Sequence, residues 1–402
     1  MSVELATLKH FGPDKRNIPI KSKNGTYVVP HSLAKLMDSQ INRWRTEYIP
    51  NLSRAQSTLP DFIIGSNRNF PSLKYLPGRQ PLTEDWRTLC EKTVSKRFEL
   101  MVEQKLISGQ LKPVYQAAFD LVFKESVQLK LPMLAMEWVV GNLFRGIGRE
   151  DEGIDLLKRQ KEQARTQILN IRSSIEGRCA SSINYLKPSF EAAILGNDLG
   201  FIAENNLPGL IDNFQKSSEL PYTWHQPLDF YKDDIYLAID YLNQSKRKIA
   251  YLLDNAGESL VDLFVIQFLL LRGHNIKVIA RSKPALNDET AAELKAFAVK
   301  NQDDLGLINM SVPIVPGSPV PGLDLTSMDE AGKEALKWAD LIIAKGEGNM
   351  MGLPPEYNYN KDIFYLFKSK SPLFSQGIGQ FTGVGTDPTA GQAVAWLKLA
   401  GK

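Results

Sequence analysis

The chain has 402 residues, of which 43% are hydrophobic and 23% charged. This length suits two domains or one extended domain, and this composition is typical of a packed globular protein and not of a disordered chain. A formal net charge of +3 is small for this length, so it gives no reason to expect nucleic acid or an anionic membrane as a partner. The longest apolar run, residues 260–271, is too short to cross a membrane and contains Asp262.

Cysteine usage points to a reducing compartment. Cys90 and Cys179 form no CxxC pair, and together with the four histidines they show no zinc-ligand spacing. The first sixteen residues contain no basic stretch followed by an apolar one, unlike a secretory signal. We therefore expect a cytoplasmic protein.

The first part of the chain is predicted to be mainly helical, over residues 1–245. Four prolines between residues 60 and 81 indicate extended chain, and we expect residues 1–82 to be irregular, with short helices such as 31–45. Apolar residues with a 3.6-residue period then predict a helix beginning at Thr83 or Asp85, one at Pro113, and a long charged one over residues 151–176.

The pattern changes near residue 246. Short apolar runs predict strands at residues 249–253, 276–280, 312–315, 341–344 and 373–375. The helices between them are expected at residues 258–273, 290–300 and from Ser327 to about residue 338. Thr290 with Glu293, and Ser327 with Glu330, have the spacing of capping boxes. This alternation predicts an α/β fold, with a Rossmann-like open parallel sheet over residues 246–402.

Polar residues follow several of these predicted strands. Asp254 and Asn255 end the first, Asp288 lies a few residues after the second, Lys345 ends the fourth, and Lys370 lies just before the fifth. Ligands of open α/β sheets bind beyond the carboxyl ends of the strands, so we expect these side chains to share one edge of the sheet.

Their chemistry suits a divalent metal and a phosphate. Asp254, Asn255 and Asp288 offer hard oxygen ligands, as magnesium or manganese prefers, and so few ligands leave room for water and substrate. Lysines beside glycines can neutralise a phosphate that approaches the backbone closely. Glu258 shares a helix face with Asp262 and is our candidate for a second-shell or base role.

Simpler interpretations remain open at this point. Asp254 and Asp288 would each also serve as the cap of the helix that follows, and Lys345 as a solvated lysine at a strand end. The glycine spacings that begin at Gly346 and Gly377 resemble dinucleotide fingerprints only loosely, because neither follows the first strand of a βαβ unit. The hypothesis of a site therefore depends on several polar residues meeting at one edge.

Four motifs resemble those of the damage-control phosphatases, the proteins of domain-of-unknown-function family 89. The first is Tyr-Leu-Leu-Asp-Asn-Ala-Gly-Glu at residues 251–258, followed by Asp262. The second is Pro-Ala-Leu-Asn-Asp-Glu-Thr at 284–290, and the third is Ala-Asp-Leu-Ile-Ile-Ala-Lys-Gly-Glu-Gly-Asn at 339–349. The fourth, Ala-Ile-Leu-Gly-Asn at 193–197, lies in the helical part.

This resemblance covers about residues 150–380 and implies a helical domain packed on a Rossmann-like core. It implies hydrolysis of phosphate esters with a divalent cation, which we expect to be manganese, magnesium, cobalt or nickel. It implies metal ligation by Asp254, Asn255 and Asp288. It also implies substrate or phosphate contacts by a set of residues spread over three segments: Asn197, Lys345, Glu347, Gly348, Asn349 and Lys370.

The chain departs from the family pattern in one position of the fourth motif. The family usually has an aspartate three residues after the asparagine, where this chain has Gly200. The cysteine pair of many compact microbial members is also missing, and residues 1–140 show no clear match. These departures leave room for a different substrate or site geometry.

We therefore predict a metal-dependent phosphomonoester hydrolase acting on small phosphorylated metabolites, with Asp254, Glu258 and Lys345 as catalytic residues. The nucleophile is either a water on the metal or the Asp254 carboxylate. One alternative is a transferase that binds a nucleotide or S-adenosylmethionine at the same edge. Another is a non-catalytic binding protein that has kept the fold. In that case Gly200, at the position of the family's aspartate, would be a first sign that activity has been lost.

Overall fold

The structure is a computed structural model of the whole chain. It describes residues 186–196, 227–284, 288–300, 312–325, 327–355, 357–370, 375 and 377–401, the strands within residues 17–66, and several helical positions within 87–103 and 161–166. The chain divides into two compact units. One comprises Met1–Thr58 with Arg79–Lys158, and the other comprises Leu59–Gly78 with Arg159–Lys402.

The first unit contains an antiparallel hairpin of β1 (Asn17–Ser22) and β2 (Gly25–Pro30). In the second unit β3 (Ile63–Ser66) pairs with β9 (Tyr357–Tyr359), far away in the sequence. The prediction that residues 1–82 are irregular is therefore wrong for these three strands. The described positions within 87–103 are helical, as predicted, while the predicted helix at residues 31–45 lies outside the described residues.

A seven-stranded sheet forms the centre of the second unit, in the order β4-β11-β10-β8-β5-β6-β7. All neighbouring strands are parallel except β10 and β11. The strands are β4 (Phe230–Asp233), β5 (Lys248–Leu252), β6 (Asn275–Ala280), β7 (Ile314–Pro316), β8 (Leu341–Lys345), β10 (Asp362–Lys368) and β11 (Ala393–Lys398). The predicted α/β fold with a largely parallel sheet is confirmed.

The sheet differs from the prediction at its outer strands. The strand predicted at residues 373–375 is wrong at Ser375, which lies in a bend, and residues 373 and 374 lie outside the described residues. The strand beside β8 is β10 instead. Strand β4 precedes residue 245, so the α/β layer begins earlier than the predicted boundary between the helical part and the core. Strand β4 pairs with β11, which is far away in the sequence, and this explains why the local pattern did not indicate β4.

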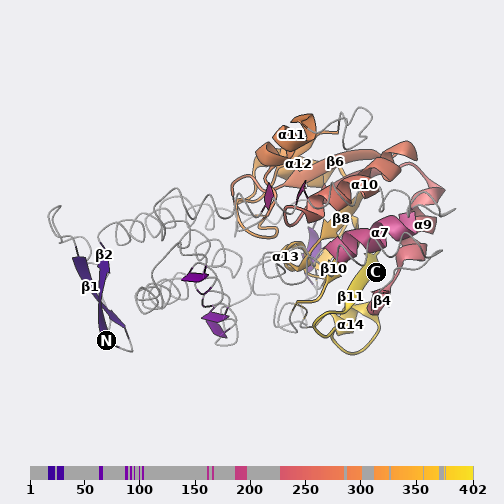
Figure 1. Ribbon diagram of the computed structural model, residues 1–402. Helices are drawn as coiled ribbons and strands as arrows, with labels where there is room; N and C mark the ends of the chain where they lie inside the picture. The colour runs from indigo at the N-terminus through magenta and orange to yellow at the C-terminus, as the bar shows by residue number, and fades with distance from the viewer. Residues whose placement is uncertain are drawn as a thin grey trace. The chain divides into compact units, whose positions relative to one another are not determined.

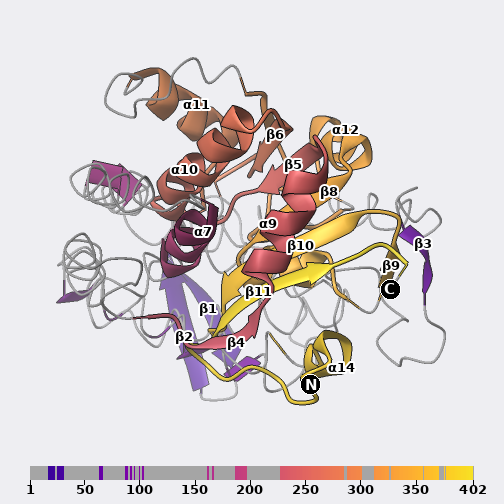
Figure 2. The same ribbon diagram turned by 90° about the vertical axis from the view of Figure 1, so that its right-hand side faces the viewer.

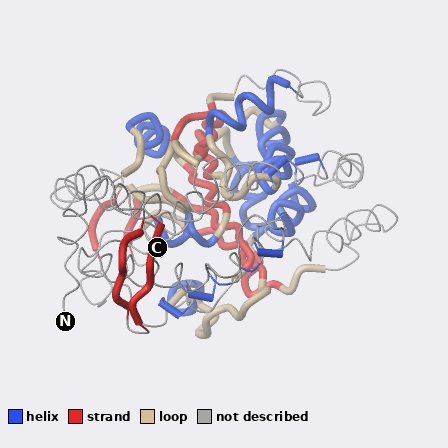
Figure 3. The backbone as a smooth tube through the Cα atoms, turned by 60° about the vertical axis from the view of Figure 1, so that its left-hand side comes forward, coloured by secondary structure: helices blue, strands red, loops and turns tan. Residues whose placement is uncertain are grey.

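Helices cover both faces of the sheet (Figure 3). Helices α7 (Leu186–Leu195), α9 (Ile235–Gln244) and α10 (Glu258–Leu271) pack side by side (Figure 1). Helix α12 (Glu330–Trp338) contacts β5, β6 and β7, and α11 (Ala291–Lys300) contacts β7 (Figure 2). There are two short helices: α13 (Glu347–Gly352) directly follows β8, and α14 (Gly379–Thr382) directly precedes β11 in the chain. None of the helices in the described ranges is long and apolar enough for a membrane span.

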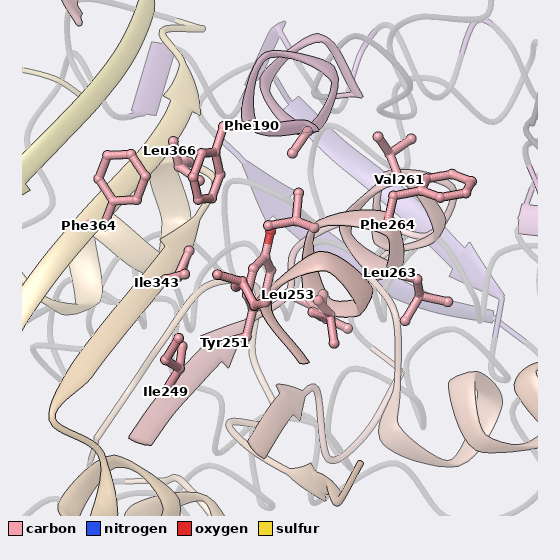
Figure 4. Packing of buried hydrophobic residues seen from close by; sticks show 14 of the residues in the cluster. Phe190, Ile249, Tyr251, Leu253, Val261, Leu263, Phe264, Ile343, Phe364 and Leu366 are labelled. Atoms are coloured by element: carbon pink, nitrogen blue, oxygen red, sulfur yellow. The ribbon is translucent and has the colours of Figure 1, made fainter. Parts of the chain in front are cut away.

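The main core lies between the sheet and helices α7, α9 and α10. Alternate residues of β5, such as Ile249 and Tyr251, belong to it, which is the period of a strand whose two faces are covered separately. Phe190 of α7 meets Phe364 of β10 edge to face, with ring centroids 5.2 Å apart (Figure 4). The buried residues of α12 lie outside this cluster, so α12 covers the opposite face.

Two predicted capping boxes have different outcomes. At α11 the backbone N of Glu293 donates to the Thr290 hydroxyl, and the backbone N of Thr290 donates to the Glu293 carboxylate, at 3.1 and 3.2 Å. That box is confirmed. At α12 the N-cap is Asp329, and the Ser327 hydroxyl donates to Asp324 instead. Helix α12 therefore begins without the predicted box.

Candidate active site

The strand order reverses direction between β5 and β8. The chain passes from β5 to β6 and β7 on one side, and β8 and β10 lie on the other. The carboxyl ends of two such strands leave a crevice where open α/β sheets bind ligands. Asp254 follows β5 and Lys345 ends β8, so the predicted polar residues flank this position.

Gly346 allows the two strand ends to approach closely. Its φ is +80°, and a Cβ added there would lie 2.0 Å from Oδ2 of Asp254. Every side chain larger than hydrogen would therefore collide with the carboxylate. The glycine after β8 is needed for Asp254 to occupy its position.

Asp288 lies beside Asp254 and Asn255, as predicted. Asn255 and Asp288 form an isolated antiparallel bridge, and the backbone N of Glu289 donates to the Asp254 carbonyl at 3.0 Å. Neither aspartate is the cap of its following helix, because the N-cap of α10 is Gly257 and the box of α11 uses Thr290. The simpler interpretation of both residues as helix caps is therefore wrong.

Arg281 bridges the two aspartates. Its Nε donates to Oδ2 of Asp288 at 2.5 Å, its Nη2 lies 3.4 Å from Oδ1 of Asp254, and its Nη1 donates to Oδ1 of Asn349 at 3.1 Å. The side chain is only 2% exposed. Arg281 therefore fixes three of the motifs relative to one another.

Sequence analysis missed Arg281, although a usable signal was present. Arg281 directly follows the predicted strand 276–280, at the same edge as Asp254. For this strand the prediction named only Asp288, seven residues farther along the chain. Applying the strand-end rule to the first residue after every strand would have found the arginine.

Glu258 orients the Asn255 amide. Nδ2 of Asn255 donates to Oε1 of Glu258 at 2.6 Å and lies 3.4 Å from Oδ2 of Asp254. With its nitrogen directed at two carboxylates, the amide presents its oxygen as the remaining polar atom. Burial raises the pKa of Glu258 to about 7, although Lys345 opposes that rise. Glu258 therefore holds the amide of a predicted metal ligand, and its base role stays a prediction.

Lys345 is fully buried and is not a lysine at the solvent edge. Its Nζ donates to the Ala193 carbonyl of α7 at 2.7 Å and lies 3.5 Å from Glu258 and 3.6 Å from Asp262. Asp262 also accepts a hydrogen bond from the Tyr251 hydroxyl at 2.8 Å. The ammonium group thus lies in the interior between one carbonyl and two carboxylates, and the predicted phosphate contact of Lys345 stays a prediction.

Asn349 and Gly348 also make contacts within the protein that hold strand ends and loops together. Nδ2 of Asn349 donates to the carbonyls of Leu253 and Lys345, at 2.9 and 2.7 Å, and thereby ties the end of β5 to the end of β8. Gly348 packs against Gly322, since a Cβ added to Gly348 would lie 2.9 Å from the Gly322 Cα. These contacts position the crevice, and the predicted substrate contacts of both residues stay a prediction.

Glu347 and Lys370 lie on the β8 and β10 side of the site. Oε1 of Glu347 accepts from the Ser375 hydroxyl at 2.8 Å, while Oε2 is buried without a hydrogen-bond partner. Burial raises the pKa of Glu347 to about 7, with Lys370 opposing the rise. For Lys370, surrounding protein lowers the pKa, but Asp254, Glu258 and other carboxylates raise it more. Lys370 as a whole residue is exposed, while its ammonium group is surrounded closely enough for desolvation to act on its pKa.

Asn197, the remaining predicted contact, lies outside the described residues, as does Gly200. The preceding Gly196 is described and lies against the first turn of α10. A Cβ on Gly196 would be 3.6 Å from the Glu258 Cα. The fourth motif therefore reaches the same side of the site as Glu258.

The donor set fits a hard divalent cation. The residues Asp254, Asn255 and Asp288 lie together, and carboxylate and amide oxygens are ligands that magnesium and manganese prefer. No set of three His, Cys, Asp or Glu side chains suited to a metal occurs among the described residues, and the predicted set contains two carboxylates and the Asn255 amide. The wider cluster contains five carboxyl groups against three cationic side chains: Asp254, Glu258, Asp262, Asp288 and Glu347 against Arg281, Lys345 and Lys370.

Comparison with known proteins gives three relatives from archaea. The chain is 26% identical to an uncharacterised protein of Methanocaldococcus jannaschii over 289 residues, or 68% of this chain and 90% of that protein. It is 26% identical to a damage-control phosphatase of Pyrococcus horikoshii over 266 residues, or 64% of this chain and 82% of that protein. A damage-control phosphatase of Archaeoglobus fulgidus is 24% identical over 248 residues, or 60% of this chain and 76% of that protein.

A solved structure shares the fold. The crystal structure of a family 89 protein from Pyrococcus horikoshii matches 78% of this chain and 98% of its own, with a TM-score of 0.55 and 21% identity. The model of the damage-control phosphatase ARMT1-like domain matches residues 89–383, which is more than half of the chain and includes all four motifs. The chain therefore belongs to the family of damage-control phosphatase ARMT1-like domains.

Proposed function

We propose that this protein is a divalent-cation-dependent phosphatase that hydrolyses phosphate esters of small metabolites. The observation that carries the proposal is the meeting of Asp254, Asn255 and Asp288 beyond the carboxyl ends of β5 and β6, beside the point where the strand order reverses. The names of two relatives, both damage-control phosphatases, support the same reaction.

The cation would be held by Asp254, Asn255 and Asp288. When bound, it supplies a Lewis acid that polarises a phosphoryl oxygen and balances negative charge. Gly346 gives Asp254 the room to take part, and the Asn255 amide is already turned by Glu258 so that its oxygen is the ligand atom. These residues are fixed in place by buried contacts, which favours a preformed site.

Lys370 is our candidate for binding the phosphate. It is exposed, and the carboxylates around it raise its pKa, so it is charged at neutral pH. A positive group beside the crevice can balance the charge that builds on the phosphoryl oxygens during transfer. We assign Lys345 a different role from the one first predicted: it neutralises Glu258 and Asp262 beneath the site.

The test is phosphatase activity on p-nitrophenyl phosphate with added Mn²⁺. Asp254→Asn and Asp288→Asn each remove one ligand charge, and turnover should fall by at least about 100-fold while the protein stays folded. Asp329→Asn is the matched control, because Asp329 is exposed and makes no capping hydrogen bond with its side chain. Unchanged turnover in either ligand variant contradicts the proposal.

The same assay separates the alternatives. Release of inorganic phosphate without a second substrate excludes a transferase. A Mn²⁺-dependent rise in melting temperature that both ligand variants lose supports the cation site independently of turnover. If Mn²⁺ leaves the melting temperature unchanged and no phosphate is released, the non-catalytic alternative holds.

A further inference from the structure

Two buried cationic residues lie outside the site described above. Lys161 is 5% exposed and Arg165 4% exposed, and both are helical, four residues apart and hence on one helix face. They belong to the long charged segment predicted as a helix over residues 151–176. Burying a charge costs free energy unless partners compensate, so their contacts should explain their position.

Lys161 contacts the segment that carries Asp288. Its Nζ donates to the backbone carbonyl of Asp288 at 2.6 Å and to Oε2 of Glu293 at 2.9 Å. Glu293 is also the acidic member of the capping box that starts α11. Lys161 therefore holds both ends of the short stretch between Asp288 and the helix.

Arg165 contacts the next residue of the same segment. It forms an ion pair with Glu289, and the second carboxylate oxygen of Glu289 accepts from the Ser259 hydroxyl at 3.0 Å. Ser259 lies in the first turn of α10, next to Glu258. The chain of contacts from Arg165 therefore ends beside the residue that orients Asn255.

These contacts restrain the backbone of Asp288 and Glu289, which sets the direction of the Asp288 carboxylate. The backbone of Glu289 is held by the Asp254 carbonyl on one side and by the Arg281 N on the other, at 3.0 and 2.9 Å. Lys161 fixes the remaining group, the Asp288 carbonyl, and so restricts rotation between the two residues. Groups that orient a ligand in this way typically change metal affinity 10-fold to 100-fold when removed.

We propose that Lys161 and Arg165 are positioning residues that hold Asp288 in the orientation needed to bind the divalent cation. This inference rests on the proposed function, because it assumes that Asp288 is a ligand. It assigns a role at the site to a helical segment that lies far from the motifs in the sequence.

The experiment compares Mn²⁺ affinity in the full-length protein, measured by electron paramagnetic resonance of free Mn²⁺. Lys161→Met and Arg165→Met should each raise the Mn²⁺ dissociation constant by about 10-fold to 100-fold. Arg165→Lys keeps a cation for Glu289 and should recover part of the affinity. Lys187→Met is the control. It also removes a lysine that forms an ion pair, but that pair, with Glu191, lies within α7.

A purely structural role predicts a different result. The variants would then unfold at lower denaturant concentration without Mn²⁺, while the folded protein would bind Mn²⁺ as the wild type does. That outcome overturns the inference and leaves the proposed function intact. If the wild type itself binds no Mn²⁺, both the inference and the proposed cation dependence are wrong.

Discussion

The backbones of Asn255 and Asp288 pair in an isolated antiparallel bridge at the carboxyl edge of the sheet. This pairing places a residue that follows β5 against one that follows β6 and a connecting loop. It brings a carboxylate and an amide from separate motifs to one position, and Arg281 lies across both aspartates.

Arg281→Met should destabilise the protein and strengthen its response to cations. Removing one partner from a buried ionic group costs about 3–5 kcal/mol, because Asp254 and Asp288 are left facing each other. A divalent cation can then take the place of the guanidinium charge. In urea unfolding, Mn²⁺ should therefore restore more free energy of unfolding to the variant than it adds to the wild type.

Arg281→Lys keeps the positive charge and serves as the control for Arg281→Met. Its loss of stability should be smaller, and its Mn²⁺ response closer to that of the wild type. An equal or smaller Mn²⁺ effect in Arg281→Met than in the wild type would falsify the view that the arginine and a cation share these carboxylates.

Gly346→Ala should abolish the site, whereas Gly383→Ala should not. Both glycines have positive φ, but Gly346 (φ +80°, ψ 153°) lies in a region that is almost exclusive to glycine, whereas Gly383 (φ +76°, ψ 5°) is left-handed helical, where alanine costs about 1–2 kcal/mol. Only at Gly346 does the added methyl group collide with Asp254, and nothing lies within 4 Å at Gly383. Thermal melts with and without Mn²⁺ should show a loss of Mn²⁺ stabilisation in Gly346→Ala alone.

Tyr251→Phe should cost more stability at pH 8 than at pH 5. The Tyr251 hydroxyl donates to the Asp262 carboxylate, and burial raises the pKa of Asp262 to about 6 despite Lys345 and this hydrogen bond. A hydrogen bond to a charged acceptor contributes about 1.5–3 kcal/mol, more than one to a neutral acceptor. The contribution of Tyr251 is therefore largest above pH 6, where Asp262 is ionised, and decreases as the pH falls.

The contribution of Asp262 itself to the free energy of unfolding depends on pH in the opposite direction. Its pKa in the folded state is raised from 3.8 to about 6, so the folded protein binds more protons than the unfolded one. Its contribution to stability is fully present below about pH 4 and is lost as the pH rises through 6. Denaturant unfolding of the wild type and Tyr251→Phe at both pH values measures the two effects. A cost of the substitution that does not change with pH would contradict this assignment.

Asn349→Asp should loosen the crevice by breaking two hydrogen bonds. The substitution keeps the oxygen that accepts from Arg281 but replaces the amide donor, which serves the carbonyls of Leu253 and Lys345, by a second acceptor. Buried acceptors left facing one another cost about 1–3 kcal/mol each. Hydrogen exchange should show faster opening at the ends of β5 and β8. Unchanged exchange there would mean that Asn349 does not hold the two strands together.

Much of the core was predictable because its signals are local. Strands β5, β6, β7 and β8 and helix α10 lie within one or two residues of the predicted ranges, as expected for apolar runs that end at polar residues. Strand β10 was missed although its apolar run, residues 363–367, is a local signal. Strands β4, β9 and β11 were missed as well, and so were β1, β2 and β3. Strands β4, β9 and β11 are short or pair with a distant segment, so local periodicity carries little information about them.

The sequence by itself determined the class of fold, the edge of the sheet that carries the polar residues, and Asp254, Asn255 and Asp288 as neighbours. It could do so because parallel strands place their carboxyl ends together. Only the tertiary structure decided that Lys345 is buried beneath the site, that Arg281 bridges the aspartates, and that Lys161 and Arg165 hold the Asp288 segment. Burial and pairing depend on residues from several elements meeting in space, and no spacing along the chain encodes that meeting.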